Sequence, residues 1–71
     1  MIENLVGTVL CIDLETNYCT LKTEEYGSVR FVLPENTLEV AKKCFIEDKQ
    51  LFLMGNMIDG NFTPTGATYL D

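Results

Sequence analysis

Runs of alternating apolar and polar residues, separated by turn-forming residues, dominate the chain. β-Branched and aromatic side chains are concentrated in these runs, which cover residues 5–13, 18–24, 28–33, 50–59 and 62–70. Side chains along a strand point to its two faces in turn, so an alternating run is typical of a strand that buries one face. The pattern therefore predicts an all-β protein with five strands.

The segment between the third and fourth runs has a helical pattern. Pro34 ends the third run, and Asn36 or Thr37 fits the N-cap position of a helix. We therefore expect one short helix over about residues 37–44. The apolar residues that share one face of this helix are Leu38, Ala41 and Phe45.

The second and third predicted strands form a hairpin, because only a short loop separates them. Residues 25–27 fit a three-residue loop in which Gly27 takes the left-handed conformation. This loop predicts that Lys22 lies opposite Arg30, and that Leu21 lies opposite Phe31. The residues expected on the core face of the hairpin are Cys19, Leu21, Thr23, Val29, Phe31 and Leu33.

Glycine and proline residues mark the other turns and irregular positions. Asp59-Gly60 is a strong signal for a two-residue turn between the fourth and fifth strands. Gly7 lies inside the first strand and predicts a bend or a close approach of another backbone segment. Pro64 and Gly66 weaken the fifth strand, which we expect to be an edge strand, a bulged strand or both.

The predicted order of strand, strand, strand, helix, strand and strand resembles the OB-fold, a small five-stranded barrel. Gly7 inside a long first strand, the helix at residues 36–44 and the Asp59-Gly60 hairpin carry the resemblance. Three patterns are also similar to small OB-like barrels found on bacterial proteins: Gly7-x-Val9-x-x-Ile12-Asp13, Val29-x-Phe31-x-Leu33-Pro34 and Leu51-x-Leu53-x-Gly55. The resemblance spans nearly the whole chain and implies one barrel domain over residues 1–71, but the fold hosts many functions.

The size and hydrophobicity of the chain fit one small domain. A chain of 71 residues is expected to bury only about 60% of the surface that it exposes when unfolded, so a partner, disulfide or metal often adds stability. Hydrophobic residues make up 46% of the chain, but no apolar run approaches the ~18 residues of a membrane helix. The first residues lack the basic start and apolar core of a signal peptide, so we expect a cytoplasmic protein.

Acidic residues clearly outnumber basic ones. The chain has 11 Asp and Glu residues against 5 Lys and Arg, which gives a formal net charge of −6. Proteins that bind duplex DNA normally present a basic face, because neutralising phosphates supplies much of their affinity. The charge balance argues against general nucleic-acid binding. It is compatible with solubility, with a basic protein partner or with mimicry of an acidic ligand.

The side chains that usually perform catalysis or bind metals are sparse. The chain has no histidine, which removes the commonest general base and every Ser-His or Cys-His pair. It also has no glycine-rich phosphate loop. Cys11, Cys19 and Cys44 lack the spacing of a zinc site, so we expect them to be buried, reduced thiols. The sequence therefore predicts neither an enzyme nor a bound metal or cofactor.

The fourth predicted strand is apolar on both faces. Alternation sends Leu51 and Leu53 to one face, and Phe52 and Met54 to the other. A half-buried strand normally has one polar face, so the second apolar face indicates an interface, or a surface covered by the N-terminal segment, the helix or the fifth strand. The residues expected at the interface are Leu10, Phe52, Met54 and Ile58. The partner would be a second copy of the chain or another protein.

The resemblance to the OB-fold implies a different binding surface. Oligonucleotide-binding members of the fold use the outer face of strands two and three and the adjoining loops. The candidate residues on that surface are Tyr18, Lys22, Tyr26 and Arg30. Single-stranded nucleic acid or a nucleotide is therefore the alternative ligand, although the surrounding negative charge disfavours phosphate. A third interpretation is an acidic inhibitor, of the phage type, that occupies a basic nucleic-acid channel.

Overall fold

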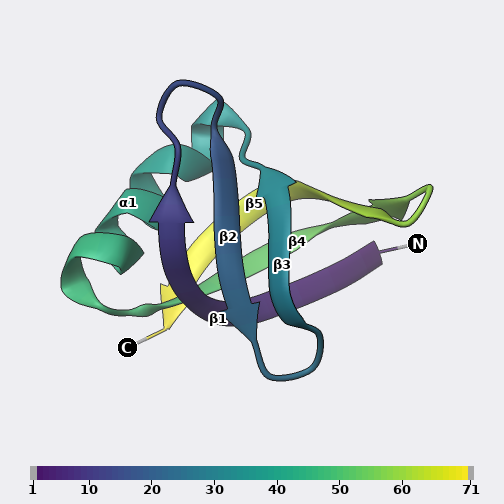
Figure 1. Cartoon of the computed structure of the whole chain (residues 1–71), viewed down its shortest axis with the longest axis horizontal. Helices are drawn as coiled ribbons and strands as arrows, with labels where there is room; N and C mark the ends of the chain where they lie inside the picture. The colour runs from purple at the N-terminus through teal and green to yellow at the C-terminus, as the bar shows by residue number, and fades with distance from the viewer. Residues whose placement is uncertain (1, 71) are drawn as a thin grey trace.

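Five strands and one helix follow one another in the order that the sequence predicts. The computed structural model describes residues 2–70, and Figure 1 shows its elements. They are β1 (Ile2–Ile12), β2 (Tyr18–Thr23), β3 (Gly27–Val32), α1 (Glu35–Glu47), β4 (Gln50–Ile58) and β5 (Asn61–Leu70). The all-β class, with one helix between the third and fourth strands, is confirmed.

The strands form one antiparallel sheet in which β1 is the central strand. The sheet order is β3-β2-β1-β4-β5. β1 pairs with β4 from Ile2 to Thr8 and with β2 from Gly7 to Ile12, so it passes from one neighbour to the other along its length. Figure 1 shows the strong curvature of β1, which rolls the sheet toward a barrel.

The barrel is approximate, because hydrogen bonds do not join the two ends of the sheet. β3 and β5 are the end strands, and no ladder connects them among the described residues. Side chains make the contact instead: the rings of Phe31 and Phe62 meet edge to face, with centroids 5.6 Å apart and an interplanar angle of 77°. An aromatic pair of this kind adds about 0.5–1.5 kcal/mol beyond its burial.

Gly7 is the position at which β1 changes partner. A Cβ atom here would lie 2.2 Å from the carbonyl oxygen of Lys22, so any other residue would force β2 to move. The close backbone approach that the sequence predicts at Gly7 is confirmed. A β-bulge follows between Val9 and Cys11, and Leu10 is the extra residue that has no partner on β2.

The hydrophobic core lies between the sheet and α1. The helix covers one side of the sheet and packs against β1, β4 and β5 (Figure 1). Its buried residues are Thr37, Ala41 and Cys44. The buried hydrophobic residues of the whole core are Leu5, Val9, Cys19, Leu21, Phe31, Leu33, Ala41, Cys44, Leu51, Leu53 and Phe62.

α1 begins earlier than the sequence predicts. Its N-cap is Pro34, in an extended conformation, rather than Asn36 or Thr37. The hydroxyl of Thr37 is used differently: it donates a hydrogen bond to the carbonyl oxygen of Pro34 at 2.7 Å, and the residue is fully buried. The predicted polar N-cap was therefore wrong, because this threonine satisfies a backbone carbonyl group rather than a free helical N–H.

α1 also continues past its predicted end. Asp48 caps the helix in a left-handed conformation, with a φ of 55°, and its N–H donates to the carbonyl oxygen of Cys44. Of the three apolar residues expected on one face, Ala41 is buried and Leu38 packs against the core, whereas Phe45 is 51% exposed. The buried face passes through Ala41 and Cys44, which leaves Phe45 outside it.

The register of the β2–β3 hairpin differs by two residues from the predicted one. Thr23 pairs with Gly27. Arg30 lies opposite Thr20, so the predicted pairing of Arg30 with Lys22 was wrong. The side chain of Thr23 closes the loop at residues 24–26. Its Oγ1 donates to the carbonyl oxygen of Gly27 at 2.8 Å and accepts a backbone N–H from the loop at 3.0 Å.

The faces of the β2–β3 hairpin are nevertheless those that the sequence predicts. A shift of two residues leaves every side chain on its own face, because the faces of a strand alternate with a period of two. Five of the six residues expected on the core face are buried, and Val29 is half-buried. The predicted core face of this hairpin is confirmed.

The β4–β5 hairpin has the predicted tight turn. Asp59 and Gly60 have φ values of 52° and 79°, and two successive positive values fit a type I′ turn. A bulge interrupts the pairing of β5 with β4 between Met54 and Gly55. β5 is also the last strand of the sheet. It is therefore both an edge strand and a bulged strand, as the sequence predicts.

Replacing Gly7 by alanine is expected to destabilise the protein, whereas the same change at Gly66 is not. A Cβ at Gly7 would overlap a backbone oxygen at 2.2 Å, but a Cβ at Gly66 would meet only the flexible end of the Met54 side chain at 3.3 Å. We expect Gly7→Ala to lower the free energy of unfolding by at least about 2 kcal/mol, and Gly66→Ala by much less. Urea unfolding followed by circular dichroism measures both, and equal losses would contradict the role of Gly7.

Candidate functional site

The outer face of β4 carries apolar side chains, as the sequence predicts. Leu51 and Leu53 point into the core and have no exposed surface. On the opposite face, Phe52 is half-buried and Met54 is 41% exposed. β4 is therefore apolar on both faces, and one of these faces lies outside the core.

Two residues of the neighbouring strands extend this apolar face. Val6 of β1 lies opposite Phe52, and Leu70 of β5 lies opposite Gln50, diagonally beside Phe52. Val6 is half-buried, and Leu70 is 44% exposed. We call the surface formed by Val6, Phe52, Met54 and Leu70 the outer patch.

Two of the residues predicted at the interface do not belong to the outer patch. Met54 lies opposite Asn4, and Leu10 follows six residues later on β1, about 20 Å along an extended strand. Ile58 lies opposite Asn61, next to the turn of the β4–β5 hairpin. Leu10 is 46% exposed and Ile58 is 54% exposed, but they lie at separate places on the surface.

Val6 and Leu70 are outward-facing residues that the sequence pattern did not single out. A signal for Val6 exists, because it follows the inward-facing Leu5 by one position in an alternating run. The signal for Leu70 is weaker, since the bulge in β5 changes the alternation midway along that strand. The pairing register places both beside Phe52, and no turn in the sequence specifies that register for β1.

None of the described segments covers the outer patch. β1 and β5 flank β4 within the same sheet, and the buried residues of α1 belong to the core on the inner face. Met54 and Leu70 keep 41% and 44% of their surface exposed. Between residues 2 and 70, no covering segment therefore accounts for the second apolar face of β4.

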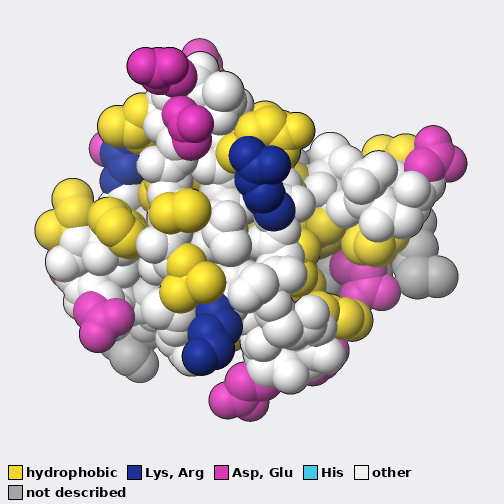
Figure 2. Space-filling view, viewed as in Figure 1, with side chains coloured by type: hydrophobic (Ala, Val, Ile, Leu, Met, Phe, Trp, Pro, Cys, Tyr) yellow, Lys and Arg dark blue, Asp and Glu magenta, His cyan; other side chains and the backbone are white. Residues whose placement is uncertain are grey.

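The residues predicted as a ligand surface on β2 and β3 fall into two groups. In the first, the guanidinium carbon of Arg30 lies 4.1 Å from the centroid of the Tyr18 ring. The second group is Lys22 and Tyr26. Lys22 lies four residues along β2 from Tyr18, about 13 Å in an extended strand. Tyr26 follows in the β2–β3 loop and is 56% exposed. Figure 2 shows the Lys and Arg side chains of the viewed face as separate groups, and the four residues are not gathered into one site.

The electrostatic field around Tyr26 is negative. The carboxylates of Glu3 and Glu25 raise the pKa of the Tyr26 hydroxyl above its usual value, and Glu3 has the larger effect. A phosphate group approaching the β2–β3 loop would meet the same field, which opposes its binding. The loop is therefore an unfavourable place for a nucleic-acid backbone.

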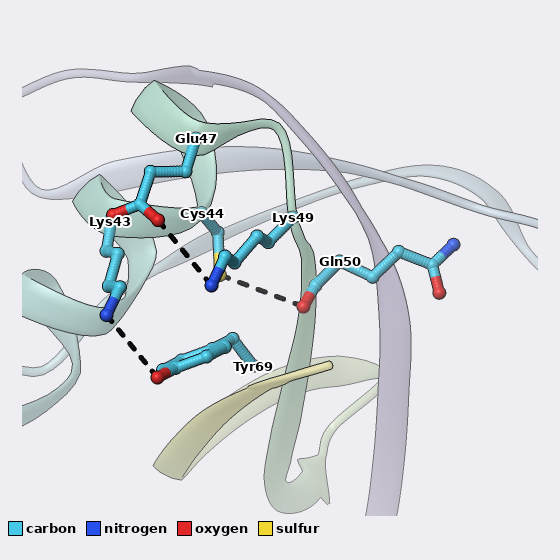
Figure 3. A network of polar contacts seen from close by, with 6 residues as sticks. All are labelled: Lys43, Cys44, Glu47, Lys49, Gln50 and Tyr69. Carbon is cyan, nitrogen blue, oxygen red and sulfur yellow. Dashed lines mark hydrogen bonds and ion pairs between the residues drawn. The ribbon is translucent and has the colours of Figure 1, made fainter. Parts of the chain in front are cut away.

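A polar network joins the end of α1 to β5. Lys43 donates a hydrogen bond to the hydroxyl of Tyr69 at 3.3 Å, and its ammonium nitrogen lies 4.6 Å from the ring centroid (Figure 3). Lys49 lies 4.5 Å from the same centroid and pairs with Glu47 at 3.5 Å. Because both lysines already have partners, the network ties the helix to the sheet and does not present an open site for an anion.

The three cysteines are free thiols that differ in exposure. Among residues 2–70, no three metal-ligating side chains of the His, Cys, Asp and Glu types come together. Cys19 and Cys44 are buried, as predicted, but Cys11 is exposed, because it follows the bulge of β1. Burial raises the pKa of the Cys19 thiol to about 12, and it also raises the pKa of Cys44.

No known protein family, curated protein or solved structure matches the chain. α1, the one helix in the described part of the chain, has neither the length nor the apolar composition needed to cross a bilayer.

One of the three thiols is expected to react quickly in the folded protein. Thiol reagents attack the thiolate, and Cys11 is the exposed cysteine, whereas burial and a raised pKa keep Cys19 and Cys44 protonated at mildly alkaline pH. Ellman's reagent should detect one fast thiol in the native protein and three in denaturant. Cys11→Ser should remove the fast reaction. Rapid reaction of all three in the native protein would contradict this assignment.

The ring of Tyr69 is expected to matter more than its hydroxyl group. Tyr69→Leu removes the ring that both Lys43 and Lys49 contact, and should lower the free energy of unfolding by about 1–2 kcal/mol. Tyr69→Phe keeps the ring and loses one long, half-buried hydrogen bond, so we expect a loss below about 1 kcal/mol. Urea unfolding compares the two, and a larger loss for Tyr69→Phe would contradict the ring's role.

Proposed function

We propose that the chain is a non-catalytic interaction module: an OB-like barrel whose outer patch binds a second copy of the chain or another protein. The observation that carries the proposal is an apolar sheet face, formed by Val6, Phe52, Met54 and Leu70, that no segment of residues 2–70 covers. A contiguous exposed apolar surface on a small protein usually marks an interaction site.

The strand residues around Phe52 and Met54 support this proposal, because they are polar but uncharged. The same-face neighbours on β1 are Asn4 and Thr8, and those on β4 and β5 include Gln50, Asn56 and Thr68. Interfaces are depleted of charged residues at their centre and have polar rims. The uncharged face contrasts with a chain that has 16 charged residues among 71, 11 acidic and 5 basic. Such a face can approach a partner without desolvating a charge.

The small size of the domain also supports a need for a partner. Among the described residues, eleven hydrophobic residues form the core and eleven large hydrophobic residues are exposed. Removing apolar surface from water stabilises the folded or bound state by about 25 cal/mol per Å². The core of so small a domain gives it only marginal stability. Burying the outer patch would add stability that the isolated domain lacks.

The strand arrangement supports the OB-like part of the proposal. The OB-fold is a five-stranded, partly open barrel. Here the order β3-β2-β1-β4-β5 puts β3 and β5 at the two ends of the sheet, and Phe31 and Phe62 bring those ends into contact. The position of α1 between β3 and β4 fits the same fold.

Binding of a nucleotide or of single-stranded nucleic acid is the second candidate function. The stack of Arg30 on Tyr18 favours it, because a base or a phosphate could contact this exposed cation–aromatic pair. The net charge of −6 and the acidic loop beside Lys22 oppose it. We therefore rank this function below protein binding.

Met54→Asp is expected to prevent association through the outer patch. Burying an unpaired carboxylate in an apolar interface is costly, so the affinity should fall by at least about tenfold. Light scattering on a size-exclusion column at several micromolar measures the mass of the wild type and the variant. If the wild type is a monomer, the measurement is instead a pull-down that compares the partners captured by the wild type with those captured by Met54→Asp.

The matched control is Leu14→Asp. Leu14 is 64% exposed in the β1–β2 loop, outside the outer patch, and the change adds the same charge. We expect this variant to keep the mass and the partners of the wild type. A folded Met54→Asp protein that also kept both would count decisively against the proposal.

A further inference from the structure

β1 has an unpaired backbone edge along its first half. Its pairing with β2 begins at Gly7, opposite Thr23, and the residues before Gly7 pair with β4 alone. The other edge of residues 2–6 therefore has no partner strand within the described part of the chain. Such an edge presents N–H and C=O groups at the spacing of a β-ladder, which suits the addition of another strand.

A groove runs beside this free edge. Its volume of about 610 Å³ falls within the range of about 300–1,000 Å³ that is usual for ligand sites. Asn4, Leu5 and Val6 line it on β1, and Thr23, Glu24 and Tyr26 line it on the β2–β3 hairpin. A chain lying in this groove would continue the line of β2 past the hairpin and remain in ladder contact with β1.

Apart from the charge of Glu3, the edge lacks the features that usually prevent strand addition. Natural edges are protected by proline, lysine, a bulge or a covering segment. Residues 2–6 include neither proline nor lysine, and the bulge of β1 lies farther along the strand, between Val9 and Cys11. Because three residues of this stretch also line the groove, an incoming chain can reach them from solvent.

The groove has an excess of negative charge. Glu24 and Glu25 line it on the hairpin loop, and Lys22 is the one cationic residue in its lining. Glu3 lies close enough to act with Glu25 in raising the pKa of the Tyr26 hydroxyl. Three carboxylates against one ammonium group attract a cationic occupant and repel an anionic one.

We propose that this groove binds an extended, lysine- or arginine-rich segment of another protein, which adds to the sheet as a strand beside residues 2–6 of β1. Backbone hydrogen bonds to the free edge supply affinity, and the carboxylates of Glu3, Glu24 and Glu25 select basic side chains. Alternate side chains of the segment point inward beside Leu5, which favours apolar residues at those positions. The site goes beyond the proposed function, because it shares only Val6 with the outer patch.

A second copy of this chain is a poor occupant of the groove. Pairing two copies along this edge would bring Glu3 and the loop carboxylates of both copies together, and each copy has a net charge of −6. Like charges at an interface oppose association. The charge of the groove therefore favours a basic chain over a copy of this one.

The test uses short, capped synthetic peptides as probes of the isotope-labelled full chain at low ionic strength. A peptide that alternates lysine and valine should shift the amide resonances of residues 2–6 and of the β2–β3 loop, and should slow hydrogen exchange at the edge. A peptide that alternates glutamate and valine should not bind. Methylating alternate backbone nitrogens of the lysine peptide removes its ladder donors, so its affinity should fall at least about tenfold.

Charge reversal separates the groove from the general negative charge of the protein. Glu24→Lys/Glu25→Lys changes two exposed loop residues, and should weaken binding of the lysine peptide by at least about tenfold. The control, Glu15→Lys/Glu35→Lys, makes the same change in net charge, and its first site is the β1–β2 loop, at the opposite end of β2 from the β2–β3 loop that lines the groove (Figure 1). We expect the control to change the affinity by less than about threefold.

Four results would overturn the proposal. They are equal binding of the lysine and glutamate peptides, equal losses for the two charge-reversed variants, amide shifts at Phe52, Met54 and Leu70 instead of residues 2–6, and, in the peptide-free protein, protected edge amides with a doubled solution mass. The last result would assign the edge to a second copy. Met54→Asp should leave peptide binding unchanged, so a failure of this proposal is distinguishable from a failure of the outer patch.

Discussion

The close contact between Gly7 and the backbone of β2 is the constraint on which the sheet depends. Because Gly7 has no side chain, the carbonyl oxygen of Lys22 can lie 2.2 Å from the position of a Cβ, and β1 can bend there. A straight β1 would leave β3 and β5 far apart at the two edges of an open sheet. The bend rolls the sheet until Phe31 and Phe62 pack edge to face. Their contact joins the two ends of the sheet and encloses the core.

The same bend accounts for the two surfaces that we propose as binding sites. β1 pairs with β2 only from Gly7 onward, so its first half keeps one backbone edge free. That half pairs with β4 instead, which places Val6 beside Phe52 and widens the apolar face of β4. The groove and the outer patch therefore depend on the same short stretch, residues 2–6. The groove lies along its free edge, and Val6 contributes to the outer patch. A shift in the pairing of β1 would change both.

The faces of the strands could be predicted from the sequence, but their registers could not. Burial follows the alternation of side chains, so a two-residue error in the β2–β3 hairpin left its core face correct. The true register depends on Thr23, whose side chain closes the loop by hydrogen bonds that no apolar pattern reveals. Leu10 is exposed, as expected, but it lies six residues beyond Asn4, the residue opposite Met54, so the register of β1 on β4 keeps it away from the outer patch. The outer patch could thus be half predicted, through Phe52 and Met54.

The uneven distribution of charge gives the two surfaces different requirements. The outer face of β1, β4 and β5 around Phe52 is uncharged, so association there depends on area and shape rather than on the sign of the partner's charge. In the groove, carboxylates such as Glu24 and Glu25 lie beside free backbone groups, and there the sign of the partner's charge decides whether it binds. Acidic residues protect the exposed edge from pairing with a copy of itself, as lysine does on other edge strands. A barrel built this way would bind its own copy and a basic chain at separate places, because the field that repels a copy from the edge is weak over the uncharged face.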